Sequence, residues 1–385
     1  MSLEALVEIS RFYGGNPEYV LAGGGNTSCK DGETLYIKGS GHSLAEASAA
    51  SFVQMDRKSL ALIWEKEYPD ISEEDPFGDQ REIAVLADLM ASRKPGEEGS
   101  PPVNKRPSVE VLLHDILPFA FVVHLHSALV NGLTCSQKGE EAMREIFGDE
   151  AIWIPIANPG YVLSKIVKSA LDEFIAAKGK PSPLIFLQNH GVFVGNNSIE
   201  GIKEIYGEIM HKIGAWIKRR PDFSDEKILT SEKWVSAGNS IDEVFWTLER
   251  LAGAVAFMRG REIASLVKNR ASFAPVMSAF TPDHIVYAGS EPLFIDSDVY
   301  ILDAWKEHID RTGRKAKIIA VQDLGIFSAE STGKAAGLAI ELFRDAVKVA
   351  VYSESFGGPL FMTQDKIDFI NNWEVERYRS NVSTK

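Results

Sequence analysis

A glycine-rich run near the N-terminus, followed closely by an Asp-Gly pair, limits the folds open to this chain. Residues 23–28 read Gly-Gly-Gly-Asn-Thr-Ser and follow the apolar segment 19–22, which predicts a short strand. The Asp-Gly pair at 31–32 lies between two strand-like runs, and Asp-Gly in that setting is a strong hairpin signal. The glycine run therefore leads into antiparallel strands, whereas a dinucleotide-binding fold needs a helix after its glycine-rich turn.

Helices and strands are mixed along the rest of the chain. Apolar periodicity predicts helices over 2–12, 46–56, 83–92, 109–117, 163–177, 198–218, 241–268, 299–307 and 333–348. Apolar runs predict strands over 119–125, 184–187, 192–194 and 317–321. A polar stretch at 219–233 marks a boundary. The mixture predicts an α/β layer fold with a mixed or antiparallel sheet.

Composition excludes several classes of function. The 385 residues suggest roughly two or three domains. The net charge of −13 repels phosphate backbones and anionic lipid, so we expect no binding to nucleic acid or to a membrane, while a local basic pocket for a phosphorylated small molecule stays allowed. Two cysteines and the lack of a long apolar run indicate a cytoplasmic protein.

Three histidines stand out as candidate metal ligands. His124 and His126 end an apolar strand, and residues two apart in a strand point to the same face. His190 lies in a Gln-Asn-His-Gly turn between two predicted strands, so the backbone fixes its direction. Three imidazoles around zinc would leave a position for substrate, as in catalytic sites. The alternative is that these are core or surface histidines with ordinary hydrogen bonds.

Other polar residues could serve the same site. Glu110 opens a predicted helix after Ser108, where it either acts as an acid and base or merely complements the helix dipole. His114, one turn later, is interpreted as structural. The loop at 38–43 and the run at 24–27 expose backbone N–H groups and hydroxyls, and together could cradle a phosphate.

An internal similarity links the two halves of the chain. Residues 184–193 align with 318–327, both with a strand, Gln, Asn or Asp, one residue, Gly and a second strand. Either two such units converged by chance or an old duplication produced them. In the second segment Leu324 stands where His190 stands in the first, so no metal would bind there.

Five short motifs occur in order between residues 19 and 215: Gly25-Asn26-Thr27-Ser28, Ser40-Gly41, Ser108-Val109-Glu110, His124-Leu125-His126-Ser127 and Gln188-Asn189-His190-Gly191. Together they resemble the class II aldolase/adducin family. Segments 122–126, 131–135 and 156–160 are most similar to the rhamnulose-1-phosphate aldolase part of bifunctional aldolase/short-chain dehydrogenase proteins. The chain ends about where their dehydrogenase would begin, so we expect a free-standing aldolase-like protein without a nicotinamide site.

The resemblance implies a three-layer αβα fold with a mainly antiparallel central sheet. Residues 1–220 would form the metal-binding catalytic domain. We also expect residues 235–385 to form a smaller α/β C-terminal region with a structural or oligomer-forming role, which would be a degenerate repeat if the internal similarity reflects a duplication. Members of the family are often tetramers, so a homo-oligomer is expected.

The resemblance also implies the site. His124, His126 and His190 would hold Zn²⁺, with Mn²⁺ or Co²⁺ as alternatives, and Glu110 would move the proton. The residues expected to contact the substrate or its phosphate are Asn26, Thr27, Ser40, Gly41 and Ser108. Val109 stands where many sugar-phosphate members have a second hydroxyl residue, so one phosphate donor is absent and the placement of the phosphate stays open.

The implied reaction is cleavage of a ketose 1-phosphate, such as L-rhamnulose 1-phosphate. The products would be dihydroxyacetone phosphate and a short aldehyde, formed through a metal-stabilised enediolate. The same scaffold also hosts sugar-phosphate epimerases, a dehydratase and decarboxylases. A non-catalytic, adducin-like binding module is the alternative of another class, and such modules lack the histidine set retained here.

Overall fold

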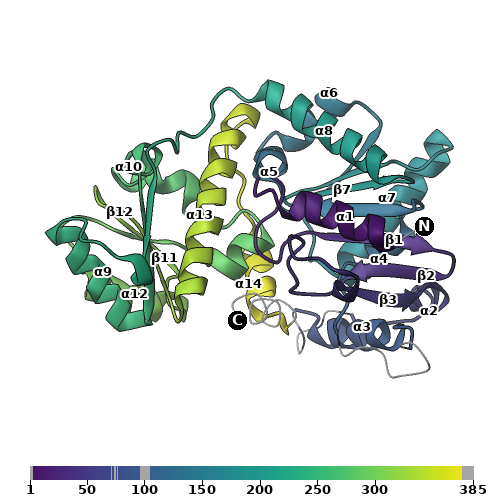
Figure 1. The fold of residues 1–385 in the computed structure, drawn as a ribbon, viewed down its shortest axis with the longest axis horizontal. Helices are drawn as coiled ribbons and strands as arrows, with labels where there is room; N and C mark the ends of the chain where they lie inside the picture. The colour runs from purple at the N-terminus through teal and green to yellow at the C-terminus, as the bar shows by residue number, and fades with distance from the viewer. Residues whose placement is uncertain (1–2, 71, 73–74, 76, 96–104, 375–385) are drawn as a thin grey trace. The chain divides into compact units, whose positions relative to one another are not determined.

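The computed structural model describes residues 3–70, 72, 75, 77–95 and 105–374. The chain divides into two compact units. Unit 1 contains Met1–Thr134 and Lys138–Trp216 and takes up the chain again at Asp368. Unit 2 contains Ile217–Ile367 together with the short segment Cys135–Gln137. Each unit has its own sheet (Figure 1).

Unit 1 is built on a seven-stranded sheet in the order β3-β2-β1-β4-β7-β6-β5. Only β5 and β6 pair in parallel, and the other five pairs are antiparallel, which confirms the predicted mainly antiparallel sheet. The predicted hairpin joins β1 to β2 with Asp31 opposite Thr34. The strands are β1 (Asn26–Asp31), β2 (Thr34–Lys38), β3 (Phe52–Asp56), β4 (Phe121–Leu125), β5 (Ala151–Ile154), β6 (Leu184–Leu187) and β7 (Gly191–Asn196).

Helices cover both faces of this sheet and complete three layers. On one face lie α1 (Leu3–Gly14), α5 (Ala128–Thr134) and α8 (Ile199–Trp216) (Figure 1). The apolar cores of the other face join the sheet to α2 (Arg57–Ile63), α3 (Asp79–Ala91), α4 (Val111–Ile116) and α7 (Tyr161–Lys178). A further helix, α6 (Gly139–Phe147), packs beside β5.

The pleat of β1 decides which side chains meet which helix layer. Ser28 turns toward α4, and its Oγ lies 2.7 Å from His114 Nδ1. Thr27 turns the other way, and its Oγ1 lies 2.6 Å from Ser10 Oγ on α1. Successive side chains of a strand alternate between faces, so Asn26 shares the α4 face with Ser28.

Three sequence predictions of secondary structure were wrong. Residues 19–22 form a turn and irregular backbone, not a strand. The helix expected over 46–56 is a 3₁₀ turn (Ala49–Ser51) followed by β3, where exposed Gln54 between buried Val53 and Met55 shows a period of two. The long helices expected over 241–268 are interrupted because the helix ends at Gly253, which has φ 113°, and a strand follows.

Unit 2 carries a five-stranded sheet in the order β10-β11-β12-β9-β8. Its strands are β8 (Lys227–Thr230), β9 (Ala254–Arg259), β10 (Leu293–Ile295), β11 (Ile318–Val321) and β12 (Gly325–Glu330). Its helices are α9 (Asn239–Ala252), α10 (Arg261–Leu266), α11 (Arg270–Phe273), α12 (Ile301–Thr312) and α13 (Gly333–Ser353), and α14 (Gln364–Asn372) follows. Shorter helical turns occupy Ser231–Lys233, Ala274–Val276, His284–Ala288 and Glu354–Phe356.

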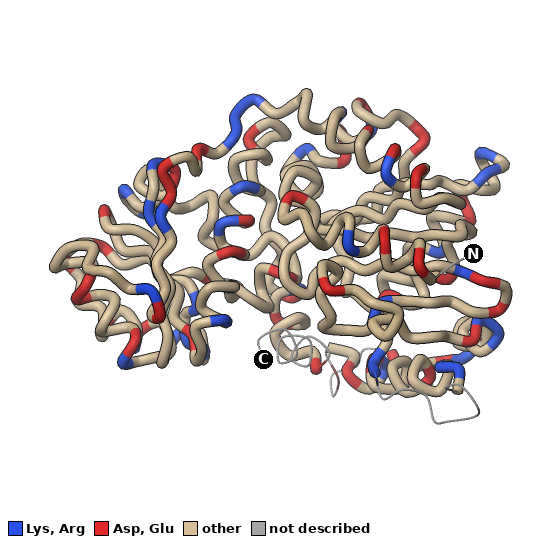
Figure 2. Tube along the Cα trace, in the orientation of Figure 1, with Lys and Arg blue, Asp and Glu red and all other residues tan. Residues whose placement is uncertain are grey.

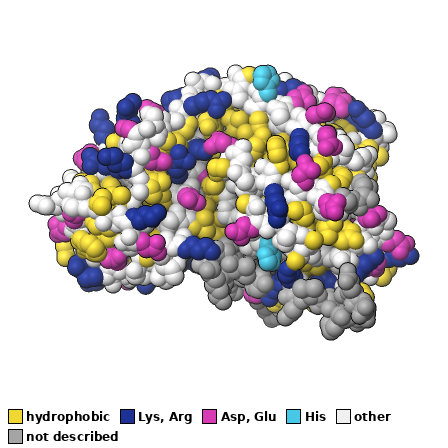
Figure 3. All heavy atoms as spheres, viewed as in Figure 1, with side chains coloured by type: hydrophobic (Ala, Val, Ile, Leu, Met, Phe, Trp, Pro, Cys, Tyr) yellow, Lys and Arg dark blue, Asp and Glu magenta, His cyan; other side chains and the backbone are white. Residues whose placement is uncertain are grey.

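Charged residues of both signs are distributed over each unit. Lys and Arg are interspersed with Asp and Glu along the trace, and the face in Figure 3 shows the same mixture (Figures 2 and 3). Within the described part of the chain, no helix is both long and apolar enough to cross a bilayer.

Candidate metal centre

Three histidines converge on the α4 face of the unit 1 sheet. His124 is fully buried on β4, and His126 follows the same strand on the same side. His190 arrives from the turn between β6 and β7. The Nε2 atom of His124 lies 2.9 Å from that of His126 and 3.4 Å from that of His190. Among the described residues, this trio is the one cluster of His, Cys, Asp or Glu found able to hold a metal ion.

Backbone contacts fix the orientation of His124. Its Nδ1 lies 3.0 Å from the carbonyl oxygen of Val192 on the neighbouring strand. A carbonyl can only accept, so Nδ1 carries the proton and Nε2 presents its lone pair to the other two histidines. The ring also stacks on Phe193 at 4.0 Å between centroids. This arrangement is the one in which an imidazole is prepared to ligate a metal.

Glu110 reaches the same point from the N-terminus of α4. Its Oε1 lies 3.5 Å from His124 Nε2 and 3.6 Å from His190 Nε2. The residue is 5% exposed, and Oε1 has no hydrogen-bond partner within the described residues. Glu110 is the N-cap residue of α4 but makes no side-chain capping bond there. The carboxylate therefore faces the histidines and does not cap its own helix.

An amide holds the other oxygen of Glu110. Asn26 Nδ2 donates to Glu110 Oε2 at 2.5 Å and to Ser108 Oγ at 3.1 Å. Its Oδ1 pairs with His114 Nε2, which must therefore carry the proton because an amide oxygen only accepts. Burial is the main cause that holds the pKa of His114 well below its usual range, and the charges of Lys30 and Lys38 lower it further. Neutral His114 thus orients Asn26, and Asn26 leaves Oε1 as the available oxygen of Glu110.

The predicted substrate residues are placed in three different settings. Asn26 and Ser108 lie against Glu110, as described. Ser40 and Gly41 form a loop beside the segment that leads to Ser108, since Ser40 N donates to Arg106 O at 2.9 Å and Ser108 N to Lys38 O at 3.2 Å. Thr27 lies on the opposite face of β1, so its hydroxyl is not brought to the histidines.

Lys38 is a residue that sequence reasoning missed. It is 2% exposed at the end of β2, and its Nζ donates to Gly23 O at 3.0 Å and to His42 O at 2.9 Å. The ammonium group thereby ties the two glycine-rich loops together. The sequence did contain a signal for this role. Lys38 is a charged residue at the end of an apolar strand and directly precedes Gly-Ser-Gly, which is unusual for a plain turn.

Two glycines allow the backbone to pass close to the histidine strand. A Cβ built on Gly191 would lie 2.5 Å from Leu125 O and 2.9 Å from His126 Cδ2. A Cβ on Gly25, which has φ 62°, would lie 2.8 Å from His124 O. Contacts under 3.0 Å to backbone cannot be relieved by a rotamer change. The site therefore needs glycine directly before Asn26, at position 25, and directly after His190, at position 191.

Replacing Gly191 with alanine is expected to weaken metal binding by roughly 10- to 100-fold, because the new methyl group displaces His126 and the strand that carries His124. Equilibrium dialysis with Zn²⁺ measures the affinity. Gly207→Ala is the matched control, since a Cβ there meets nothing within 4 Å. Equal affinities in the two variants would contradict the assigned crowding.

The donor set fits a borderline divalent cation. Imidazole nitrogen and carboxylate oxygen are both ligands that zinc accepts. A buried carboxylate oxygen without a partner is costly, and a cation held by the three histidines would lie beside Glu110 Oε1 and offset that cost. His124, His126 and His190 are therefore the residues that could hold the metal, with Glu110 directly adjacent.

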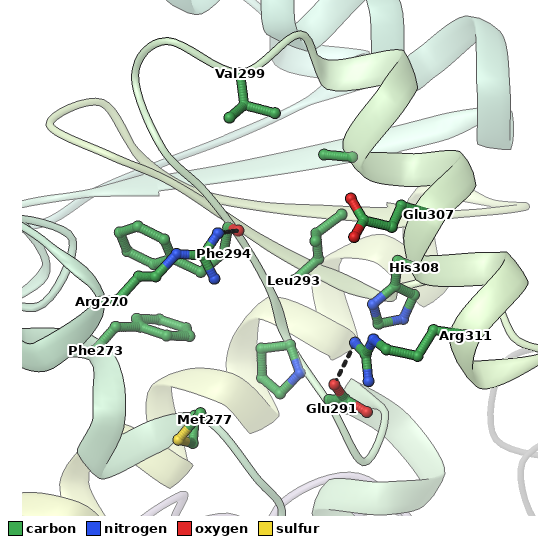
Figure 4. Close-up of a pocket in the computed structure, with 12 residues that line it drawn as sticks. Arg270, Phe273, Met277, Glu291, Leu293, Phe294, Val299, Glu307, His308 and Arg311 are labelled. Atoms are coloured by element: carbon green, nitrogen blue, oxygen red, sulfur yellow. Dashed lines mark hydrogen bonds and ion pairs between the residues drawn. The ribbon is translucent and has the colours of Figure 1, made fainter.

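A separate cavity of about 280 Å³ lies in unit 2, and none of the predicted site residues lines it (Figure 4). It is bordered by α11, β10 and α12, and both apolar and charged side chains line it. Both of its arginines are paired, with Arg311 2.5 Å from Glu291 and Arg270 2.7 Å from Asp296. His308 and Glu307 line this cavity, but the one convergent group of candidate metal ligands found among the described residues is the trio around His124.

Comparison with known proteins gives the family and the relatives. The model of the class II aldolase and adducin N-terminal domain matches residues 4–206. A Bacillus subtilis (strain 168) protein named uncharacterized oxidoreductase YuxG is 21% identical over 98% of this chain, which spans 58% of that protein. The N-terminal class II aldolase domain of a conserved Thermoplasma acidophilum protein is 24% identical, with a TM-score of 0.45, over 57% of this chain and 94% of its own. L-fuculose-1-phosphate aldolase from Thermus thermophilus is 16% identical, with a TM-score of 0.33, over 55% of this chain and 89% of its own.

Proposed function

The chain belongs to the class II aldolase and adducin N-terminal domain family, and from that premise we propose that it is a metal-dependent aldolase. Its substrate would be a ketose 1-phosphate such as L-rhamnulose 1-phosphate. The products would be dihydroxyacetone phosphate and a short aldehyde. The observation that carries the proposal is the buried Glu110 Oε1, unpartnered within the described residues and aimed between His124 and His190.

The residues of the site would have distinct roles in metal binding and proton transfer. A divalent cation, when bound, supplies positive charge that stabilises the negative charge developing as the carbon–carbon bond breaks. His124, His126 and His190 would hold that cation. Glu110 Oε1 would move the proton at the carbon next to the ketone, delivering it after cleavage and removing it in the reverse direction.

Asn26 would act as the residue that positions Glu110. Its amide donates to Oε2, and neutral His114 holds the amide in turn. Because these bonds occupy Oε2, the free oxygen always faces the histidines. The sequence identifies both residues, and the hydrogen bond between Asn26 and Glu110 supports this positioning role.

A phosphate would be bound away from the histidines, by the loop at Ser40–Gly41 and by Ser108. The supporting observation is the buried ammonium of Lys38, which lies under the loop and supplies positive charge in a protein of net charge −13. Backbone N–H groups of such loops are suited to anions. Val109 contributes no hydroxyl, so fewer side-chain donors would reach the phosphate.

The direct test is product formation by the full chain loaded with Zn²⁺, Mn²⁺ or Co²⁺. L-rhamnulose 1-phosphate is expected to yield dihydroxyacetone phosphate, detected by its enzymatic reduction, and chelation by EDTA is expected to stop the reaction. L-rhamnulose without phosphate should react at least about 10-fold more slowly if the Ser40 loop binds phosphate. Absence of dihydroxyacetone phosphate from metal-loaded protein would overturn the aldolase assignment, and protein that retains no metal would support a binding module instead.

A further inference from the structure

The sheet of unit 2 repeats part of the sheet of unit 1. The order β5-β6-β7-β4-β1 in unit 1 corresponds to β10-β11-β12-β9-β8 in unit 2. In both series the first pair is parallel and the next three pairs are antiparallel. Two unrelated sheets would rarely share both this strand order and a single parallel pair at the same edge.

The helices follow the strands in the same order along the chain. Unit 1 runs β4, α5, α6, β5, α7, β6, β7 and α8. Unit 2 runs β9, α10, α11, β10, α12, β11, β12 and α13. From β4 and β9 onward, each helical connection in one unit therefore has a helical counterpart in the other, and β6–β7 and β11–β12 are both joined by a turn.

The turn that carries His190 recurs in detail. Its Asn189 and the corresponding Asp323 both have positive φ, 57° and 62°, which is uncommon for residues other than glycine. Backbone and side-chain bonds around the two turns also correspond. They are Gln188 N to Ile154 O and Gln322 N to Ile295 O, both 2.9 Å; Asn189 N to Thr134 O at 3.1 Å and Asp323 N to Val267 O at 3.0 Å; and Ile156 N to Gln188 Oε1 and Ser297 N to Gln322 Oε1, both 3.2 Å.

Strand register turns this likeness into a residue-by-residue match. On β7, Phe193 pairs with His124, and on β12 the corresponding Phe327 pairs with Phe257. The His124 ring lies 4.0 Å from that of Phe193, and the Phe257 ring lies 4.7 Å from that of Phe327. Phe257 in unit 2 therefore occupies the position that His124 has in unit 1.

The close contacts of Gly191 and Gly325 agree with this alignment. A Cβ on Gly191 would meet Leu125 O at 2.5 Å, and one on Gly325 would meet Met258 O at 2.8 Å. Met258 thus matches Leu125, which places Arg259 at the position of His126. Leu324, which directly precedes Gly325, matches His190.

We infer that unit 2 is a diverged copy of the metal-bearing part of unit 1, in which Phe257, Arg259 and Leu324 have replaced the three histidines. Phenylalanine and leucine offer no lone pair, and a guanidinium has no acceptor and repels a cation. Unit 2 therefore keeps the scaffold of a metal centre without its ligands, and among the described residues only unit 1 carries a complete ligand set. This inference does not rest on the reaction proposed for unit 1.

The test is to restore the histidines in the full chain. Phe257→His/Arg259→His/Leu324→His is expected to bind one more Co²⁺ per chain than the wild type, counted by elemental analysis after dialysis. Phe257→His/Arg259→His, which keeps Leu324, is the matched control and is expected to bind tightly no additional Co²⁺. The readout is the gain relative to wild type, so a wild type without metal would contradict the proposed function alone.

A triple variant that folds, as judged by circular dichroism, and gains no Co²⁺ would overturn the inference. Crystallography of the wild type covers the case in which the triple variant does not fold. Superposition of the five corresponding strands is expected to place Phe257 on His124, Arg259 on His126 and Leu324 on His190. A register shifted by one or more residues would overturn the inference, and so would a wild type with a second metal in unit 2.

Discussion

Replacing His124 with phenylalanine is expected to abolish tight metal binding and to lower kcat/KM by on the order of 10³-fold, because a bound cation contributes several kcal/mol to the transition state. His124 is the central member of the trio, since its Nε2 is the atom close to both other imidazoles. Phenylalanine is the chosen replacement because Phe257 fills the corresponding place in unit 2 against an equivalent ring. The variant should therefore keep the fold while losing the ligand, and metal content and turnover measure the two effects.

The control for this variant is His211→Ala, which changes an exposed histidine on α8. It should retain both metal and activity. EDTA treatment of the wild type should reproduce the loss seen in His124→Phe, and added Zn²⁺ should restore the wild type only. A His124→Phe protein that holds metal as tightly as the wild type would show that these histidines are core residues and not ligands.

The fold of unit 1 was largely predictable from local pattern. The hairpin at Asp31-Gly32 and the apolar strand ending at His124 carry strong signals, and the structure contains both. Two of the three errors in secondary structure have one cause. Over 46–56 and 241–268, apolar residues are dense enough to satisfy either helical or strand periodicity, and only the pairing of β3 with β2 and of β9 with β12 decides between them.

The candidate site was predictable in its residues but not in its contacts. Strand alternation places His124 and His126 on one face, yet nothing in the sequence shows that Glu110 turns away from its own helix terminus. Nor does it show that Asn26 lies opposite His124 in the sheet. These facts depend on pairing between segments some 80 to 100 residues apart, which local pattern does not encode.

The same limit applies to the relation between the two units. The sequence similarity around His190 and Leu324 covers ten residues, too few to separate duplication from chance. Strand order, pair direction and turn bonds extend the match to five strands. Sheet topology persists where side chains diverge, because backbone hydrogen bonds such as those of Gln188 and Gln322 do not depend on whether His190 or Leu324 stands in the turn.

Replacing Glu110 with glutamine is expected to lower kcat by roughly 10²- to 10⁴-fold while the metal is retained, since the amide cannot accept the proton that the carboxylate would move. Glutamine has the same shape, and its carbonyl oxygen can still accept from Asn26 Nδ2, so the packing around α4 should survive. Turnover and metal content, measured on the same sample, separate the two effects, with exposed Glu204→Gln on α8 as the control. A carboxylate that only complemented the helix dipole would leave kcat unchanged and alter stability by about 0.3–1 kcal/mol. The two roles therefore give different results, and the orientation of Oε1 toward His124 and His190 favours the catalytic one.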